Sequence, residues 1–149
     1  MPHLDNIQKK GYVLEFGHLS RDKGTDTLLE VAKKMPNTEF VFIGYGPLVD
    51  KMKDIPNVKY LGFKTGEELY RIIAEAAISV CPSEWYENCP YSVMESVLLG
   101  TPVVGSKMGG IPELIEPGKT GELFEAGNVE DLMKAIKKVL QTQRTYWKD

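Results

Sequence analysis

The sequence has few cysteines, no long hydrophobic run and no excess of basic charge. Its two cysteines, Cys81 and Cys89, fit no metal-binding spacing and are too few for a disulfide framework. The apolar runs are too short for a membrane-spanning helix. Eighteen basic and 21 acidic residues give a net charge of -3, which argues against nucleic-acid binding. We therefore expect a cytoplasmic protein with reduced thiols and no nucleic-acid partner.

Internal repeats and low-complexity tracts are also absent from the sequence, and residues 1–10 are not expected to be a signal peptide. The length of 149 residues, with 42% hydrophobic and 26% charged residues, is typical of one globular domain. We expect residues 1–10 to be a linker from a missing N-terminal domain and residues 11–142 to form the folded domain. Residues 143–149 are then a C-terminal tail.

Short apolar runs alternate with longer amphipathic stretches along the chain. Runs of this kind predict strands at 12–16, 40–43, 58–61, 78–81, 102–105 and 121–124. The amphipathic stretches predict helices at 25–35, 67–77, 90–100 and 129–141, with shorter helical segments ending near 53 and at 111–115.

Five or six buried strands, each followed by a helix, predict an α/β fold. The expected architecture is a Rossmann-like, doubly wound parallel sheet with helices on both faces. In such sheets, ligands bind at the carboxyl ends of the strands, where the order of the strands reverses. The loops that follow strands are therefore the place to look for functional residues.

The loop after the first strand combines glycine with basic side chains. Residues 17–24 include Gly17, His18, Arg21 and Lys23 and lead into a helix, whose N-terminus offers free N–H groups to an anion. The segment matches neither the Walker loop nor the dinucleotide-binding glycine motif. It either binds phosphate or is an ordinary turn with solvated charges. A second glycine turn, which contains Gly46, follows the next strand.

The segment 83–95 is the richest in candidate functional residues. Glu87 is expected in a loop, and Glu95 lies eight residues later in a mostly apolar helix. A carboxylate in such a helix needs a partner or a cleft, although each acid taken alone is better interpreted as a solvated charge. Residues 88–90 are expected to form the first turn of this helix, whose amides could bind a phosphate.

These segments together resemble the C-terminal, donor-binding domain of GT-B fold retaining glycosyltransferases of the group 1, or family 4, type. The resemblance covers residues 11–140, and its blocks occur in the order of that family. Segments 17–24, 43–48, 61–69 and 101–113 are similar to family blocks, and Glu87 and Glu95 stand in its Glu-x7-Glu relationship. His18 departs from the pattern, because the family usually has an arginine there.

The resemblance implies a role for each candidate residue in binding a nucleotide sugar. Lys23 is expected to contact the donor diphosphate and Glu87 the transferred sugar, which makes these two the catalytic residues. Glu95 is expected to bind the ribose, and backbone around Phe63 and Lys64 the base. The other expected donor-binding residues are Gly17, His18, Arg21, Gly46, Asn88, Cys89, Pro90 and Tyr91.

The implied reaction is transfer of a hexose to a glycan or lipid-linked acceptor, as in polysaccharide biosynthesis. The sequence has no Asp-x-Asp triplet, so no metal and no cofactor is expected. GDP-mannose is the first expected donor, with a UDP-sugar as the alternative. The acceptor is expected on the missing N-terminal domain, through which alone a peripheral membrane contact would form. The isolated chain should then bind nucleotide but transfer nothing.

Three other functions remain open at this point. A glycosidase also needs two carboxylates, but it has no use for phosphate-binding loops. A sugar-nucleotide epimerase of the same architecture and a non-catalytic nucleotide-binding module are the other two alternatives.

Overall fold

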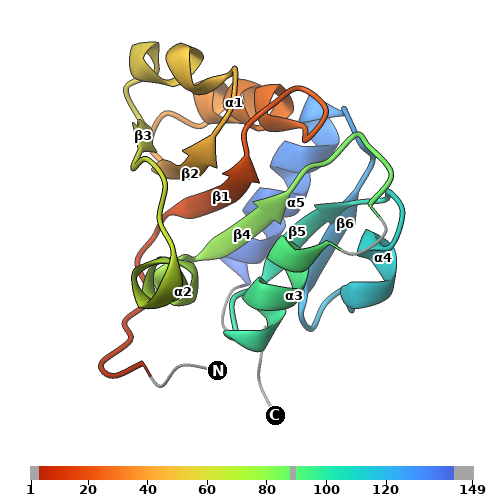
Figure 1. Ribbon diagram of the computed structural model, residues 1–149. Helices are drawn as coiled ribbons and strands as arrows, with labels where there is room; N and C mark the ends of the chain where they lie inside the picture. The colour runs from red at the N-terminus through yellow and green to blue at the C-terminus, as the bar shows by residue number, and fades with distance from the viewer. Residues whose placement is uncertain (1–3, 88–89, 143–149) are drawn as a thin grey trace.

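A six-stranded parallel sheet forms the centre of the molecule, in the order β3-β2-β1-β4-β5-β6 (Figure 1). The structure is a computed structural model that describes residues 4–87 and 90–142. The predicted α/β, doubly wound fold is confirmed. The strands are β1 (Val13–His18), β2 (Phe40–Tyr45), β3 (Val58–Tyr60), β4 (Ile78–Cys81), β5 (Val103–Ser106) and β6 (Gly121–Phe124).

Helices cover both faces of this sheet (Figure 1). The apolar sides of α1 (Thr25–Lys34) and α5 (Val129–Gln141) pack on one face and form the largest core cluster. On the other face lie α2 (Gly66–Glu75), α3 (Tyr91–Leu98) and α4 (Ile111–Leu114), which form two smaller clusters. The 3-10 helix η1 (Val49–Asp54) follows β2. Across the described ranges, no helix has the length and apolar character needed to cross a membrane.

The order of the strands reverses between β1 and β4. Val13 of β1 pairs with Phe40 of β2 on one side and with Ile78 of β4 on the other. The chain therefore winds outward from β1 to β3 and then returns to build the other half of the sheet from β4. The loops after β1 and β4 leave in opposite directions, so a crevice opens between the carboxyl ends of these two strands.

The first two strands are longer than the sequence indicated. Gly17 and His18 were expected to follow the first strand, but they pair with Gly44 and Tyr45 as the last residues of β1. The glycines interrupt the apolar pattern without interrupting the backbone pairing, which explains the error. His18 is consequently held by a strand, and not by a loop.

Helix α3 begins later than expected. Pro90 is not part of its first turn, because the extended backbone of this residue (ψ 90°) caps the helix instead. The amides of Val93 and Met94 donate to the carbonyl oxygen of Pro90 at 3.1 and 3.2 Å. The same prediction for Asn88 and Cys89 lies outside the described residues.

The end of the expected linker packs on the amino-terminal edge of the sheet. Lys9 Nζ donates to the carbonyl oxygen of Ala76 at 3.1 Å and to Thr101 Oγ1 at 2.9 Å. Burial lowers the pKa of Lys9 to about 8. The amide of Lys10 donates to the carbonyl oxygen of Glu75. This anchor leaves the opposite, carboxyl-terminal edge of the sheet free.

Gly24→Ala tests the close contact between the β1–α1 loop and the end of β4. Gly24 has a φ of +76°, and a Cβ there would lie 1.9 Å from the carbonyl oxygen of Pro82. We expect this variant to lose more unfolding free energy in urea than the roughly 1–2 kcal/mol that left-handed backbone alone costs. Gly100→Ala is the control, because Gly100 has a φ of +78° but open space around it. Equal losses in the two variants would contradict this account.

Candidate functional site

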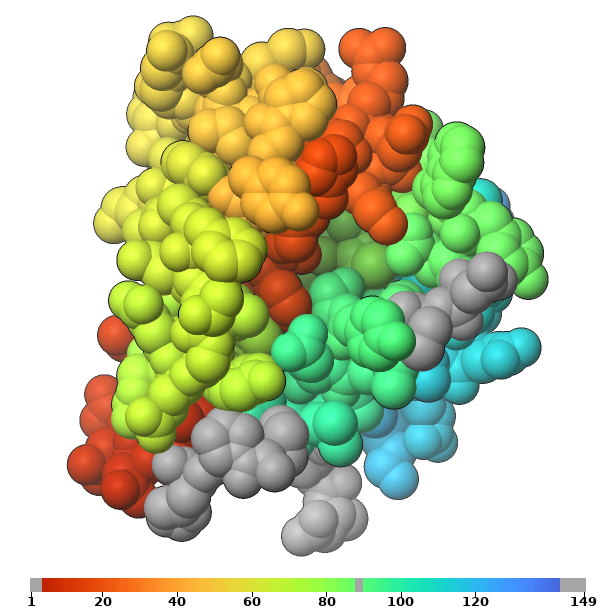
Figure 2. Space-filling model, in the orientation of Figure 1, coloured from red at the N-terminus to blue at the C-terminus, as the bar shows by residue number. Residues whose placement is uncertain are grey.

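A cavity of about 190 Å³ lies at the reversal point between β1 and β4. It is lined by residues 15–18 of β1, by residues 80–83 at the end of β4, by residues 90–92 at the start of α3, and by Lys23 and Glu87. In Figure 2 the cavity is the hollow between two surfaces. One is the red and orange surface of β1 and the β1–α1 loop, and the other is the green surface of α3. The cavity therefore occupies the crevice that the topology creates.

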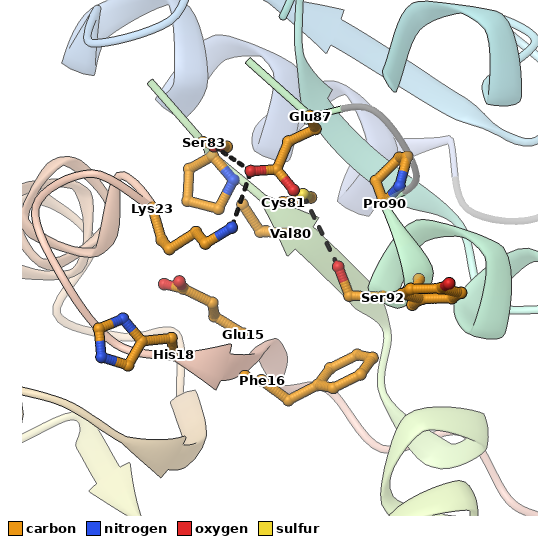
Figure 3. A pocket seen from close by; sticks show the side chains of 13 residues that line it. Glu15, Phe16, His18, Lys23, Val80, Cys81, Ser83, Glu87, Pro90 and Ser92 are labelled. Carbon is orange, nitrogen blue, oxygen red and sulfur yellow. Dashed lines mark hydrogen bonds and ion pairs between the residues drawn. The ribbon is translucent and has the colours of Figure 1, made fainter. Parts of the chain in front are cut away.

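Lys23 and Glu87 form an ion pair inside this cavity (Figure 3). Lys23 Nζ lies 2.8 Å from Glu87 Oε2, and Ser83 Oγ donates to the same oxygen at 3.0 Å. The β1–α1 loop carries Lys23, and the loop after β4 carries Glu87. The structure thus brings together the two residues that the sequence predicted as catalytic, and each neutralises the charge of the other.

The backbone of Glu87 is held by the loop between β5 and α4. The amide of Gly110 donates to the carbonyl oxygen of Glu87 at 2.6 Å. Gly109 has a φ of +52°, and a Cβ there would lie 2.3 Å from that same oxygen. The glycine at 109 thus allows this close contact between backbones, which helps to set the position of Glu87.

Glu15 is a cavity residue that the sequence analysis missed. It lies on β1, is only 4% exposed and accepts a hydrogen bond from Thr25 Oγ1 at Oε2, at a distance of 2.9 Å. Its Oε1 is buried and has no hydrogen-bond partner. Burial raises the pKa of Glu15 to about 8, against the lowering effect of the Thr25 hydrogen bond, and the charge of Asp26 raises it further. Glu15 is therefore mostly protonated at neutral pH.

A second cavity, of about 300 Å³, adjoins the first and shares Phe16, Gly17 and His18 with it. Its other walls include Phe63 and Lys64, the residues predicted to hold the base. The rings of His18 and Tyr45 meet edge to face at 5.5 Å, and that of Phe63 lies 6.1 Å beyond Tyr45. This apolar, aromatic surface is of the kind on which a flat base can stack.

Gly46 and Arg21 line neither of the two cavities. Gly46 lets the end of β2 approach the neighbouring loop, since a Cβ there would lie 2.2 Å from the carbonyl oxygen of Leu19. Arg21 has a 77% exposed side chain, pairs with Asp26 at 3.6 Å and lines an outer hollow together with His18 and Lys23. Its guanidinium therefore does not line the cavity that holds Glu87.

Glu95 lies on α3, one turn beyond the residues that line the cavity. It is partly buried, and burial raises the pKa of its carboxyl. Pro90 and Tyr91 line the cavity, whereas Asn88 and Cys89 lie outside the described residues. The predicted binding roles of all these residues stay predictions.

Cys81 lines the same cavity at the end of β4. Burial raises the pKa of its thiol to about 11, so the thiol stays protonated and is a poor nucleophile at neutral pH. Within residues 4–87 and 90–142, no three His, Cys, Asp or Glu side chains gather in a group that could hold a metal ion.

The sequence matches the family model of the glycosyl transferases group 1 over residues 3–148. Sulfoquinovosyl transferase SQD2 of Arabidopsis thaliana is 33% identical over 144 residues, and amylovoran biosynthesis glycosyltransferase AmsK of Erwinia amylovora is 32% identical over 153 residues. Both alignments cover 92% of this chain. The chain spans only 28% of the length of the first relative and 38% of the second.

Among solved structures, HepE of Anabaena in complex with UDP has the same fold. The TM-score is 0.81 at 25% identity, and the alignment covers 92% of this chain and 41% of HepE. A second HepE structure, in complex with UDP and glucose, gives a TM-score of 0.80. The likeness thus extends over nearly all of this chain but over less than half of HepE.

The stability of the chain should depend on the proton of Glu15. The folded state keeps this proton up to about pH 8, whereas the unfolded chain releases it near 4.5. The unfolding free energy should therefore fall as the pH rises between these values, by at most about 1.4 kcal/mol per pH unit.

Urea denaturation from pH 5 to 8 should show this slope in the unfolding free energy, and Glu15→Gln should lose it. Glu116→Gln, an exposed control, should keep it. Matching slopes in the wild type and Glu15→Gln would disprove the assignment.

Proposed function

The chain belongs to the glycosyl transferases group 1 family, and from that membership we propose that it is the donor-binding domain of a retaining, metal-independent hexosyltransferase. The observation that carries the proposal is the Lys23–Glu87 pair in the cavity between β1 and β4. A cation and a carboxylate there offer the two groups that a sugar diphosphate requires. The cation suits the phosphate oxygens, and the carboxylate suits the sugar hydroxyls.

In this proposal Lys23 stabilises the diphosphate as it leaves. Negative charge builds on the phosphate oxygens when the sugar–phosphate bond breaks, and a fixed cation at that position lowers the barrier. Glu87 accepts hydrogen bonds from hydroxyls of the transferred sugar. The 2.8 Å ion pair between the two residues has to open when the donor enters, and Ser83 remains as a partner that keeps Glu87 in place.

The base of the nucleotide occupies the adjoining aromatic cavity. The three lining residues that the two cavities share join the diphosphate position to the base position, with Phe63 and Lys64 at the far wall. HepE, which has this fold, is solved with UDP and with UDP and glucose, and this supports a UDP-hexose as the donor. GDP-mannose is the other candidate.

The acceptor, a glycan or a lipid-linked sugar, binds to a second domain outside this chain. The chain spans 28% and 38% of the two relatives named above and 41% of HepE, which leaves room in them for such a domain. In this proposal the chain alone binds the donor and transfers nothing. The complete protein works in the cytoplasm and meets a membrane only peripherally, through the second domain.

A calorimetric screen of this chain with UDP, UDP-glucose, GDP and GDP-mannose tests the proposal. We expect one nucleotide series to bind and to raise the melting temperature, because a ligand that binds only the folded state stabilises it. Neutral oligosaccharides should do neither. Binding of oligosaccharides without any binding of nucleotides would favour a glycosidase and would refute the proposed donor site.

Lys23→Ala should weaken the binding of UDP by about 10- to 100-fold. The estimate follows from the loss of one hydrogen bond to a charged group, worth about 1.5–3 kcal/mol. Lys33→Ala is the control, because Lys33 pairs with Glu30 on the exposed side of α1, away from the cavity. Circular dichroism should show that both variants are folded. The same UDP affinity in the two variants would remove Lys23 from the site.

A further inference from the structure

The cavity between β1 and β4 would carry too much negative charge for its proposed ligand if all its acidic side chains were ionised. Lys23 is already neutralised by Glu87, so the two together add no net charge. Glu15 lines the same cavity and, if ionised, would give it a net negative charge. A nucleoside diphosphate carries at least two negative charges on its phosphates. An ionised Glu15 would therefore repel this ligand, and its burial would leave the repulsion weakly screened.

Burial and the nearby acid Asp26 favour the neutral form of Glu15, against the hydrogen bond from Thr25. Figure 3 shows its carboxyl pointing toward His18 and Lys23. Asp26, at the start of α1, is an acid whose Oδ1 is also buried without a hydrogen-bond partner. Cys81 on β4 keeps its thiol protonated, and Glu87 in the loop after β4 already takes the charge of Lys23. Tyr91, at the start of α3, brings a phenol to the cavity wall.

The position of the proton on Glu15 follows from its hydrogen bonds. Oε2 accepts from Thr25 Oγ1, while Oε1 is buried and has no partner. A neutral carboxyl can carry a proton on the unpartnered oxygen, where an anionic neighbour would stabilise it. Any phosphate beside Lys23 is such a neighbour.

We propose that a nucleoside diphosphate occupies this cavity together with a proton held on Glu15, so that donor binding is coupled to proton uptake. This inference rests on the proposed function of the site. Burial raises the pKa of Glu15 to about 8 in the ligand-free chain, and the charge of the diphosphate raises it further. Below pH 8 the donor thus enters a site that is already protonated. Above pH 8 the site takes up a proton from solution as the donor binds.

The consequence for affinity has a definite sign. Above the pKa of the free chain, every binding event removes a proton from solution, so affinity falls as the pH rises. The fall approaches about tenfold per pH unit once Glu15 is fully ionised in the free chain. Glu15→Gln keeps the shape and the neutral charge of the protonated acid at every pH. It should bind UDP without this loss.

Titration calorimetry of UDP into this chain at pH 8.5, in two buffers of different ionisation enthalpy, measures the proton uptake. We expect the wild type to take up more than half a proton per UDP and Glu15→Gln to take up clearly less. Lys9→Gln is the matched control. Lys9 also has a pKa of about 8, but it lies at the opposite edge of the sheet, so its loss should leave the uptake unchanged.

Three outcomes would overturn the inference. The first is that the wild type binds UDP without taking up a proton. The second is that the wild type and Glu15→Gln take up equal amounts of proton. A third outcome is that Glu15→Gln loses the pH dependence of stability, as expected, but keeps the wild-type pH dependence of UDP affinity. Glu15 then has a structural role only. A wild type that binds neither UDP nor GDP at pH 7 refutes the proposed function itself.

A spectroscopic measurement keeps the test decisive if Glu15→Gln does not fold. The carboxyl carbon of Glu15 in 13C-labelled wild type reports its protonation directly. At pH 8.5 we expect the ionised form to dominate without UDP and the protonated form to dominate with saturating UDP. A Glu15 signal that stays ionised with UDP bound would contradict the inference.

Discussion

The reversal of strand order between β1 and β4 is the constraint on which the site depends. Both strands are central and parallel, and their loops diverge, so the crevice between their ends cannot be filled by the chain connecting them. Side chains from two loops far apart in sequence can therefore meet in this crevice, as Lys23 and Glu87 do. Close contacts at Gly24 and Gly109 then bring each loop against its neighbour. A side chain at either glycine would separate the pair.

The two acids of this crevice have different surroundings. Glu87 contacts Lys23 and the Ser83 hydroxyl, whereas burial raises the pKa of Glu15 and holds it neutral. The first can accept hydrogen bonds from a sugar. The second limits how much negative charge the cavity carries before an anionic ligand arrives.

Much of this arrangement could be predicted from the sequence, because apolar periodicity and the rule for parallel sheets fix where loops converge. The bounds of β4, β6 and α5 match the predicted ranges, and Lys23 and Glu87 meet as expected. The end of β1 was wrong because Gly17 reads as a loop residue although its backbone still pairs. Glu15 was missed because it lies within a predicted strand, whereas functional residues were sought in the loops that follow strands. Its place in a central strand, buried on both faces, was the available signal.

The central claim is that a nucleoside diphosphate binds in the crevice between β1 and β4. A crystal structure of this chain with UDP tests it most directly. The account predicts the diphosphate beside Lys23, with the ion pair to Glu87 opened, and the uracil ring in the aromatic cavity near Phe63. UDP bound elsewhere on the surface, with the Lys23–Glu87 pair intact, would contradict the account.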